Sequence, residues 1–251
     1  MRLSYVFGLK KFFYKNPENI IINFNLIPFN KVDVFKDNSC KTLITFNEKY
    51  DDIAGNISVR LIGNENYVDF EKNRKAFYFD GNSYFEIDAA LTNLPMTISL
   101  WVKTTQRVVG VYGWANPVFI GVATVNLYDF GIENNDGYLH IFSGFYGEDY
   151  FKTNKFIADN NWHHIVVDFS INGEKIYCDN TLISIRNKDN VTLSNTNIEN
   201  CSGKWYIGNM IRNCNGFVEK SILNQTSIAN LRIFNKDLSK KEIEFLYKNK
   251  I

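Results

Sequence analysis

One segment, NWHHIVVDFSINGEKIYCDNTLI (residues 161–183), constrains the fold more than any other part of the chain. Residues 162–169 form an apolar, β-branched run with aromatic ends, which is typical of a buried strand. Asn172-Gly173 is a dipeptide favoured in tight hairpin turns, and residues 176–178 provide a second short strand. Asp179-Asn180 tolerates the positive φ of another turn. The segment therefore predicts two antiparallel strands bounded by tight turns.

Similar strand signals recur along most of the chain. Residues 97–103 alternate cleanly, with Ile98, Leu100 and Val102 on one face. Aromatic residues, which favour strands, make up 16% of the chain, and with only 4 prolines the turns must rely on Gly, Asn and Asp. Strands are expected within 42–46, 76–87, 97–103, 118–127, 138–142, 205–207 and 228–234. This spacing predicts an all-β sandwich of two antiparallel sheets.

The two ends of the chain differ from this pattern. Near the C-terminus, Ser239 and Glu242 form a capping box, and Ile243, Leu246 and Tyr247 make one apolar stripe. They predict a short helix that docks on the sandwich edge. Residues 1–38 mix Lys, Asn and aromatic residues without a clean period, which indicates an N-terminal arm or anchor ahead of a domain at 39–251.

The charge balance excludes several classes of function. A net charge of +1, from 28 basic and 27 acidic residues, gives no electrostatic footprint for nucleic acid or an anionic membrane. No stretch approaches the ~18 apolar residues of a membrane span. The apolar run at residues 3–9 is too short for a secretory signal, and its lysines follow it instead of preceding it. Export by the usual route is therefore not expected.

Four cysteines do not make a disulfide framework in a chain of this length. Cys40 and Cys178 lie in strand-like surroundings, where buried free thiols are usual. Cys201 and Cys214 share a Gly- and Asn-rich neighbourhood, so both a bridge and two free thiols remain open.

Six segments taken in order carry a family resemblance: LITFNEKYDDIAGN (43–56), AFYFDGNSYFEI (76–87), MTISLWVKT (96–104), the segment 161–183, WYIGN (205–209) and IANLRIFNKDLSKKEIEFLY (228–247). Together they resemble the laminin G-like, concanavalin A-like lectin/glucanase jelly-roll superfamily, which implies a jelly-roll sandwich. Asn180 stands where the family usually has Gly, and VEKSILNQTS (218–227) is an insertion. An arm leading directly into such a domain resembles bacteriophage virion proteins, namely head decorations, appendages and tail-associated adhesins.

Catalysis is not expected from the residues present. Glycosidases need two carboxylates about 5.5 Å apart for retention, and the glucanases of this superfamily place acids at alternate positions of one strand. Glu148 and Asp149 are adjacent, so on a strand they face opposite ways. The same alternation separates His163 from His164, which therefore cannot easily share one metal. We expect no enzyme activity and a hydrogen-bonding role for these histidines within the sandwich.

No cofactor or metal is predicted, although the resemblance leaves calcium open, because some members bind it through loop aspartates. The candidate aspartates are Asp51, Asp52, Asp80, Asp129 and Asp136. None forms an EF-hand-like loop, and turn formation by the Asp side chains is the favoured interpretation.

The loops around residues 110–117 and 144–150 combine aromatic, Gly and polar residues. Lectin sites, to which these loops are similar, stack sugar rings on Trp or Tyr and bind hydroxyls with Asn or Asp. The candidate ligand-binding residues are Tyr112, Trp114, Asn116, Tyr146, Asp149 and Tyr150. Packing or interface aromatics are the alternative interpretation.

The sequence thus predicts a non-catalytic structural and binding module on a virion, which displays a glycan-binding type of sandwich. Its expected partners are a larger assembly bound through the arm, further copies of the chain and a cell-surface glycan. One alternative is an extracellular carbohydrate-binding adhesin domain of a cellular organism, secreted or at the cell surface. The other is a glycoside hydrolase with unrecognised acids.

Overall fold

The computed structural model describes residues 5–6, 9–10, 28, 30–88, 94–109, 116–122, 128–145, 150–170, 172–187, 204–214 and 217–251. For residues 5–6, 9–10, 128–129, 144–145, 150, 211–214 and 217–220 it describes the backbone alone. The strands are β1 (Tyr5–Val6), β2 (Leu9–Lys10), β3 (Cys40–Ile44), β4 (Val59–Ile62), β5 (Tyr67–Glu71), β6 (Arg74–Asp80), β7 (Tyr84–Asp88), β8 (Met96–Thr104), β9 (Val118–Val122), β10 (Tyr128–Asn135), β11 (Tyr138–Phe145), β12 (Tyr150–Phe156), β13 (His163–Ser170), β14 (Gly173–Cys178), β15 (Thr181–Asn187), β16 (Lys204–Ile207), β17 (Ile211–Cys214), β18 (Phe217–Lys220) and β19 (Asn224–Phe234), and the helix is α1 (Lys240–Asn249).

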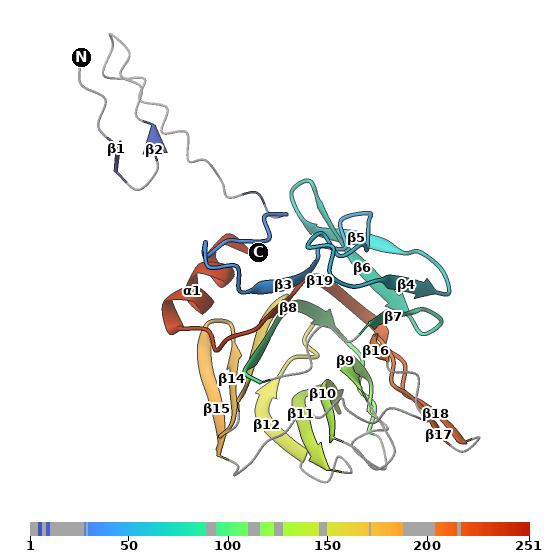
Figure 1. Cartoon of the computed structure of the whole chain (residues 1–251). Helices are drawn as coiled ribbons and strands as arrows, with labels where there is room; N and C mark the ends of the chain where they lie inside the picture. Colours follow the sequence, from blue (N-terminus) through green and yellow to red (C-terminus); the bar gives the residue numbers. More distant parts are fainter. Residues whose placement is uncertain are drawn as a thin grey trace.

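Two antiparallel sheets face each other across one core, as the sequence predicts (Figure 1). The seven-stranded sheet has the order β12-β11-β10-β9-β16-β7-β4. The eight-stranded sheet has the order β15-β14-β13-β8-β19-β6-β5, with β3 also paired to β19. Phe77, Phe79 and Phe85 form the aromatic centre of the core, with ring centroids 4.6–6.1 Å apart. Such edge-to-face contacts add to the stabilisation from area burial.

The opening hairpin folds as the sequence predicts. In the β13–β14 pair Ile165 lies opposite Cys178 and Ser170 opposite Gly173, while β13 also pairs with β8 from His163 to Phe169. Asp179 and Asn180 have φ values of 51° and 62°, which fits a tight turn into β15. Cys40 and Cys178 are buried free thiols, as predicted. Cys201 lies outside the described residues and the Cys214 side chain is not described, so their pairing stays a prediction.

Helix α1 starts at the predicted capping box, in which Ser239 and Glu242 bond to each other's backbone N–H groups. Its docking site differs from the prediction: α1 lies on the outer face of the eight-stranded sheet and not on the sandwich edge (Figure 1). Ile243 and Leu246 pack with the cluster that includes Leu43, Val166 and Phe234. The helix takes this position because its apolar stripe matches apolar outward residues on central strands. Within the described residues, no helix is long and apolar enough to cross a membrane.

The last residues of the predicted arm belong to the folded unit. Phe35 packs against the rings of Phe234 and Phe245, with centroids 5.6 and 5.9 Å away. The buried guanidinium of Arg232 donates from Nη1 to the carbonyl oxygens of Lys31 and Val32, at 2.9 and 3.4 Å. Residues 31–35 are therefore fastened to β19 and α1. The arm boundary at residue 38 stays a prediction.

Candidate functional site

Most of the predicted ligand-binding residues lie outside the part of the chain that the structure describes. These are Tyr112, Trp114, Tyr146 and Asp149, while Tyr150 begins β12 with only its backbone described. Asn116 is described and is fully buried. Its side-chain amide donates to Glu133 Oε1 at 2.9 Å, and its carbonyl oxygen accepts from Ser221 Oγ. The contact of Asn116 with Glu133 therefore makes the sheet surface around Glu133 the candidate site.

The strands that flank the two predicted loops enter the sheet at opposite ends. Val118, just after the first loop, lies opposite Glu133, which in turn lies opposite His140. Phe145, just before the second loop, lies opposite Tyr128. Glu133 and Tyr128 are five positions apart on β10, about 17 Å along an extended strand. A ligand site that used both loops would therefore have to extend across the sheet surface between them.

This surface is defined by strand alternation. Ile132 and Ile141 point into the core, so Glu133 and His140 point outward. The same register places outward-facing side chains on six strands of the seven-stranded sheet, namely β4, β7, β10, β11, β12 and β16. We call this surface the β10 face, and its residues are Arg60, Tyr84, Glu86, Glu133, His140, Phe142, Lys152 and Tyr206. It combines aromatic rings with carboxylates and cations, the lining that polar ligands require.

A buried polar network lies at the centre of the β10 face. Glu133 Oε1 is hydrogen-bonded to His140 Nδ1 as well as to Asn116. Burial raises the pKa of Glu133, and the bonds to His140 and Asn116 only partly oppose this rise. Glu133 Oε2 is buried without a hydrogen-bond partner. An unpaired buried polar oxygen costs about 1–3 kcal/mol, which a water or a ligand hydroxyl that donates to it would recover.

Glu133 and His140 were missed from the sequence, although a signal for them exists. Asn135-Asp136-Gly137 is a turn sequence, and Asp136 and Gly137 adopt φ values of 51° and 84°. Glu133 and His140 are equally far from this turn, so a hairpin places them side by side. No turn sequence of this kind predicts the contact between Asn116 and Glu133, which are 17 residues apart.

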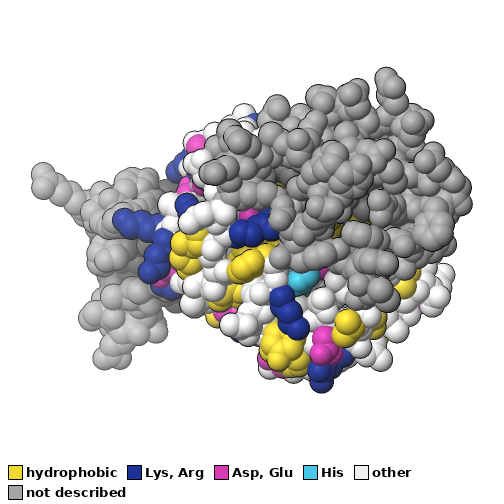
Figure 2. Space-filling model, turned by 90° about the horizontal axis from the view of Figure 1, so that it is seen from below, with side chains coloured by type: hydrophobic (Ala, Val, Ile, Leu, Met, Phe, Trp, Pro, Cys, Tyr) yellow, Lys and Arg dark blue, Asp and Glu magenta, His cyan; other side chains and the backbone are white. Residues whose placement is uncertain are grey.

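Apolar and aromatic side chains surround this network. Phe142 contacts Val118 and Met210, and its ring lies so close to Gly131 that a Cβ there would overlap it. Tyr206 and Tyr84 continue the surface, with ring centroids 6.3 Å apart. In the view of Figure 2, basic and acidic side chains are interspersed among hydrophobic ones on the described surface. The coloured, described part of the surface in that view shows no extended field of one sign, in keeping with the net charge of +1.

Among the acids whose side chains are described, Glu86 on the β10 face is too far from Glu133 for glycosidase chemistry. Glu86 is three strands away, about 14 Å across the sheet, and pairs with Arg60. This separation exceeds the ~5–9.5 Å between the carboxyl groups of glycosidases. Glu148 and Asp149 lie outside the described residues.

His163 and His164 point to opposite sides of β13, as alternation predicts. His164 is fully buried, stacks on Trp101 with centroids 4.9 Å apart and bonds to Ser99 Oγ at 2.9 Å. Burial lowers the pKa of His164 to about 3. His163 donates to Asp179 Oδ2 at 2.7 Å and to Asp159 Oδ1 at 3.1 Å. Burial lowers the pKa of His163, but these two carboxylates outweigh it and the net shift is upward.

Two of the aspartates considered for calcium, Asp52 and Asp80, accept hydrogen bonds from backbone N–H groups as turn-forming aspartates do. Asp52 accepts from four backbone N–H groups, those of Leu43, Ala54, Asn56 and Ile57. Asp80 accepts from the N–H of Asn82 at 2.9 Å, and Asp136 pairs with Arg107 at 3.0 Å. Asp51 is exposed, and the Asp129 side chain is not described. Within the described residues, none of these aspartates belongs to a group of three metal-ligating side chains.

Comparisons with known proteins agree with this architecture. A family model described as the concanavalin A-like lectin/glucanases superfamily matches residues 79–244. Domain 4 of AbnA, a GH43 extracellular arabinanase from Geobacillus stearothermophilus in complex with arabinotriose, superposes with a TM-score of 0.64 and 18% identity, over 83% of this chain and 98% of that chain. No curated protein matches the sequence.

Toxin binding domains are also similar. The binding domain of Paraclostridial Mosquitocidal Protein 1 has a TM-score of 0.60 and 14% identity, over 84% of this chain and 52% of that chain. The binding domain of Botulinum neurotoxin DC in complex with rat synaptotagmin II has a TM-score of 0.60 and 16% identity, over 84% of this chain and 51% of that chain. The chain therefore spans about half the length of these two domains. At such identities the likeness concerns the fold.

Proposed function

Because this chain belongs to the concanavalin A-like lectin/glucanases superfamily, we propose that it is a non-catalytic glycan-binding module whose binding surface is the β10 face. The observation that carries the proposal is the buried network of Asn116, Glu133 and His140, with Glu133 Oε2 left without a partner. Sugar hydroxyls are suitable donors to such an oxygen, and the half-buried ring of Tyr84 on the same face offers a stacking surface. Phe142 and Tyr206, the described rings closest in register to this network, are themselves buried.

Two variants and one control test this proposal. Glu133→Gln keeps the size of the side chain but removes its carboxylate, and Lys152→Ala removes an exposed cation from the β10 face. Lys175→Ala removes an exposed lysine from β14 in the other sheet. The full chain is screened on a glycan array that includes arabino-oligosaccharides and sialylated glycans, because solved neighbours bind arabinotriose or are complexed with SialylT. Hits are then measured by calorimetry.

We expect the Glu133 and Lys152 variants to lose about tenfold or more in affinity for the best ligand, which corresponds to ~1.4 kcal/mol. The Lys175 variant should bind as the unmodified chain does. Equal binding by all three variants would show that the β10 face is not the site. Absence of any glycan ligand would contradict the function itself. Turnover of a polysaccharide that is lost on changing Glu133, Glu148 or Asp149 would instead support the glycoside hydrolase alternative.

We further propose that the module is displayed on a virion and anchored there through the arm. The support is the Lys-, Asn- and aromatic-rich composition of the arm, together with the firm attachment of residues 31–35 to β19 and α1. Deletion of residues 1–29 should abolish incorporation into the assembly and leave the sandwich folded. Normal incorporation of this truncated chain would contradict the anchor. Deletion to residue 38 is unsuitable, because it removes the partners of Arg232 and the Phe35 ring.

The alternative location is the surface of a cellular organism, where the same module would serve as an adhesin. The two readings differ in the neighbouring genes: virion genes beside this one support the first, and an upstream signal peptide supports the second.

A further inference from the structure

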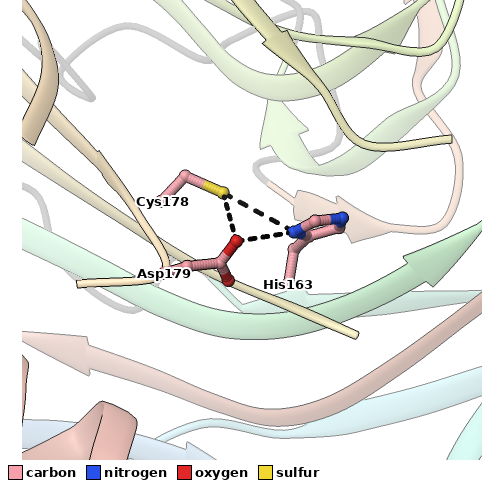
Figure 3. Close-up of side chains that lie close together, drawn as sticks. All are labelled: His163, Cys178 and Asp179. Atoms are coloured by element: carbon pink, nitrogen blue, oxygen red, sulfur yellow. Dashed lines mark hydrogen bonds and ion pairs between the residues drawn. The ribbon is translucent and has the colours of Figure 1, made fainter. Parts of the chain in front are cut away.

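Three potential metal ligands converge at the rim of the sandwich, away from the β10 face (Figure 3). They are His163 at the start of β13, Cys178 at the end of β14 and Asp179 in the following turn. Cys178 lies opposite Ile165, so the period of two brings His163 to the same side of the sheet. Asp179 breaks this alternation with a φ of 51°, which returns its side chain toward Cys178.

The distances between the three ligand atoms are close to those of a tetrahedral site. His163 Nδ1 lies 2.7 Å from Asp179 Oδ2 and 4.0 Å from Cys178 Sγ, and Sγ lies 3.6 Å from Oδ2. Around a tetrahedral zinc ion with bonds of about 2.0–2.3 Å, such atoms lie about 3.3–3.6 Å apart. The Sγ–Oδ2 distance already fits, and the other two distances have to change by only about half an ångström each. One nitrogen, one sulfur and one oxygen form a donor set that suits Zn²⁺ and not Ca²⁺ or Mg²⁺.

The surroundings of the cluster orient its ligand atoms. Asp159 Oδ1 accepts from His163 Nε2 at 3.1 Å, which leaves Nδ1 to face Cys178 and Asp179. The backbone N–H of His164 donates to Asp179 Oδ1 at 3.0 Å, which leaves Oδ2 facing the cluster. Metal-binding histidines are commonly held by a carboxylate on the second ring nitrogen in this way. Neither of these contacts would have to change on metal binding.

A cation already occupies the approach to the site. Lys155, on β12 of the opposite sheet, places Nζ 3.2 Å from Asp179 Oδ2. His163 and Cys178 are buried, whereas the side chains of Lys155 and Asp179 are 30% and 26% exposed. An entering metal ion therefore reaches the cluster from the Lys155 side and displaces a flexible ammonium group into solvent.

We propose that His163, Cys178 and Asp179 form a site for Zn²⁺ or a chemically similar transition-metal ion, with water as the fourth ligand. Binding forms bonds from the metal to Nδ1, Sγ and Oδ2, and releases to solvent the protons that Nδ1 and Sγ carried. Two protons leave as two positive charges arrive, so the net charge of the site is unchanged. The site is independent of glycan binding, since its residues are not part of the β10 face.

The test is titration of the full chain with Zn²⁺ by calorimetry and with Co²⁺ by absorption, where thiolate ligation produces a near-ultraviolet charge-transfer band. We expect one ion per chain. Cys178→Ser should remove the band and weaken Zn²⁺ binding at least tenfold, while Cys40→Ser, which changes the second buried thiol among the described residues, should change neither. Lys155→Met should strengthen binding several-fold, because it removes the competing cation.

The Lys155 and cysteine variants together distinguish a metal site at His163, Cys178 and Asp179 from misfolding and from a metal site elsewhere on the chain. Lys155 is partly exposed, so its variant should fold even if a change at His163 does not. Failure of both the unmodified chain and the Lys155 variant to bind Zn²⁺ would overturn the proposal. Binding that persists in the Cys178 variant, or that is lost in the Cys40 variant, would assign the metal to another place on the chain and overturn it as well.

Discussion

A buried acid beneath the turn before α1 gives the sharpest prediction. Asp168 on β13 is 2% exposed and lies under residues 236–238. Burial raises the pKa of Asp168 to about 6, with Asp237 adding to the rise and Thr97, the Leu238 N–H and Lys175 opposing it. The hydrogen bonds of Thr97 also indicate that Asp168 is protonated. Thr97 Oγ1 lies 2.6 Å from both Asp168 Oδ1 and the Lys236 carbonyl oxygen, yet a hydroxyl has one proton. Both contacts are hydrogen bonds when Asp168 is protonated and donates to Thr97.

The sign of the pH dependence follows from linkage. The pKa of Asp168 is about 6 in the folded chain and near 3.8 in an unfolded one, so between these values the folded state binds more protons. The contribution of Asp168 to stability therefore falls as pH rises from about 4 to about 6. A rise of about two pH units in a pKa corresponds to about 3 kcal/mol, at 1.36 kcal/mol per unit. Asp168→Asn, which mimics the protonated acid, should recover on the order of this amount above pH 7.

The assay is urea unfolding of the unmodified chain and of Asp168→Asn at a series of pH values from 4 to 8. The observable is the difference in unfolding free energy between the two proteins, because His164, with its pKa lowered to about 3, titrates over the same range with the opposite sign. This difference should grow by about 3 kcal/mol in favour of the variant between pH 4 and pH 7.5. Asp51→Asn, at an exposed position, is the control and should give a flat difference. A flat or falling difference for Asp168→Asn would refute the reasoning.

Three further changes test the packing. Gly131→Ala should destabilise the chain by about 1–3 kcal/mol in urea unfolding, because its Cβ would overlap the Phe142 ring; an unchanged midpoint would contradict this close approach. Ser239→Ala should cost about 1 kcal/mol through loss of the capping box, measured as a lower melting temperature, and Ser239→Asp, which keeps a capping oxygen, should restore it. Phe35→Ala should cost about 2–4 kcal/mol by removing its contacts with Phe234 and Phe245, whereas an effect below 0.5 kcal/mol would mean that the segment before β3 is not part of the folded unit.

The fold was predictable because its strongest signals are local. The Asn172-Gly173 turn and the alternation in 97–103 each specify a neighbour a few residues away, and their order along the chain specified the sandwich. In the two large sheets, the strands β4, β5, β10, β12 and β15 were not predicted. Residues of β4 and β5 are mostly half-buried or exposed, so their periodicity is weak. The docking of α1 was mistaken because an apolar stripe shows that a helix packs, but not on which surface.

The candidate site was harder to predict from the sequence than the fold, because it depends on contacts between residues that are far apart along the chain. Glu133 and His140 could be paired through their hairpin turn, but the bond from Asn116 depends on the irregular register between β9 and β10. At the rim, the adjacency of His163 and His164 does not indicate the cluster, since the partners of His163 are Cys178 and Asp179. Only the left-handed backbone of Asp179 brings that carboxylate beside the thiol.

The fastening of residues 31–35 has a mechanical consequence. If the arm is fixed and a ligand is held on the sandwich, tension enters the fold where Arg232 holds the carbonyl groups of Lys31 and Val32. Arg232 lies on β19, which is flanked by β8 and β6 and also pairs with β3. The load is therefore shared among interior strands and does not peel an edge strand such as β15 or β5. A module tethered in this way can resist pulling without a disulfide at its point of attachment.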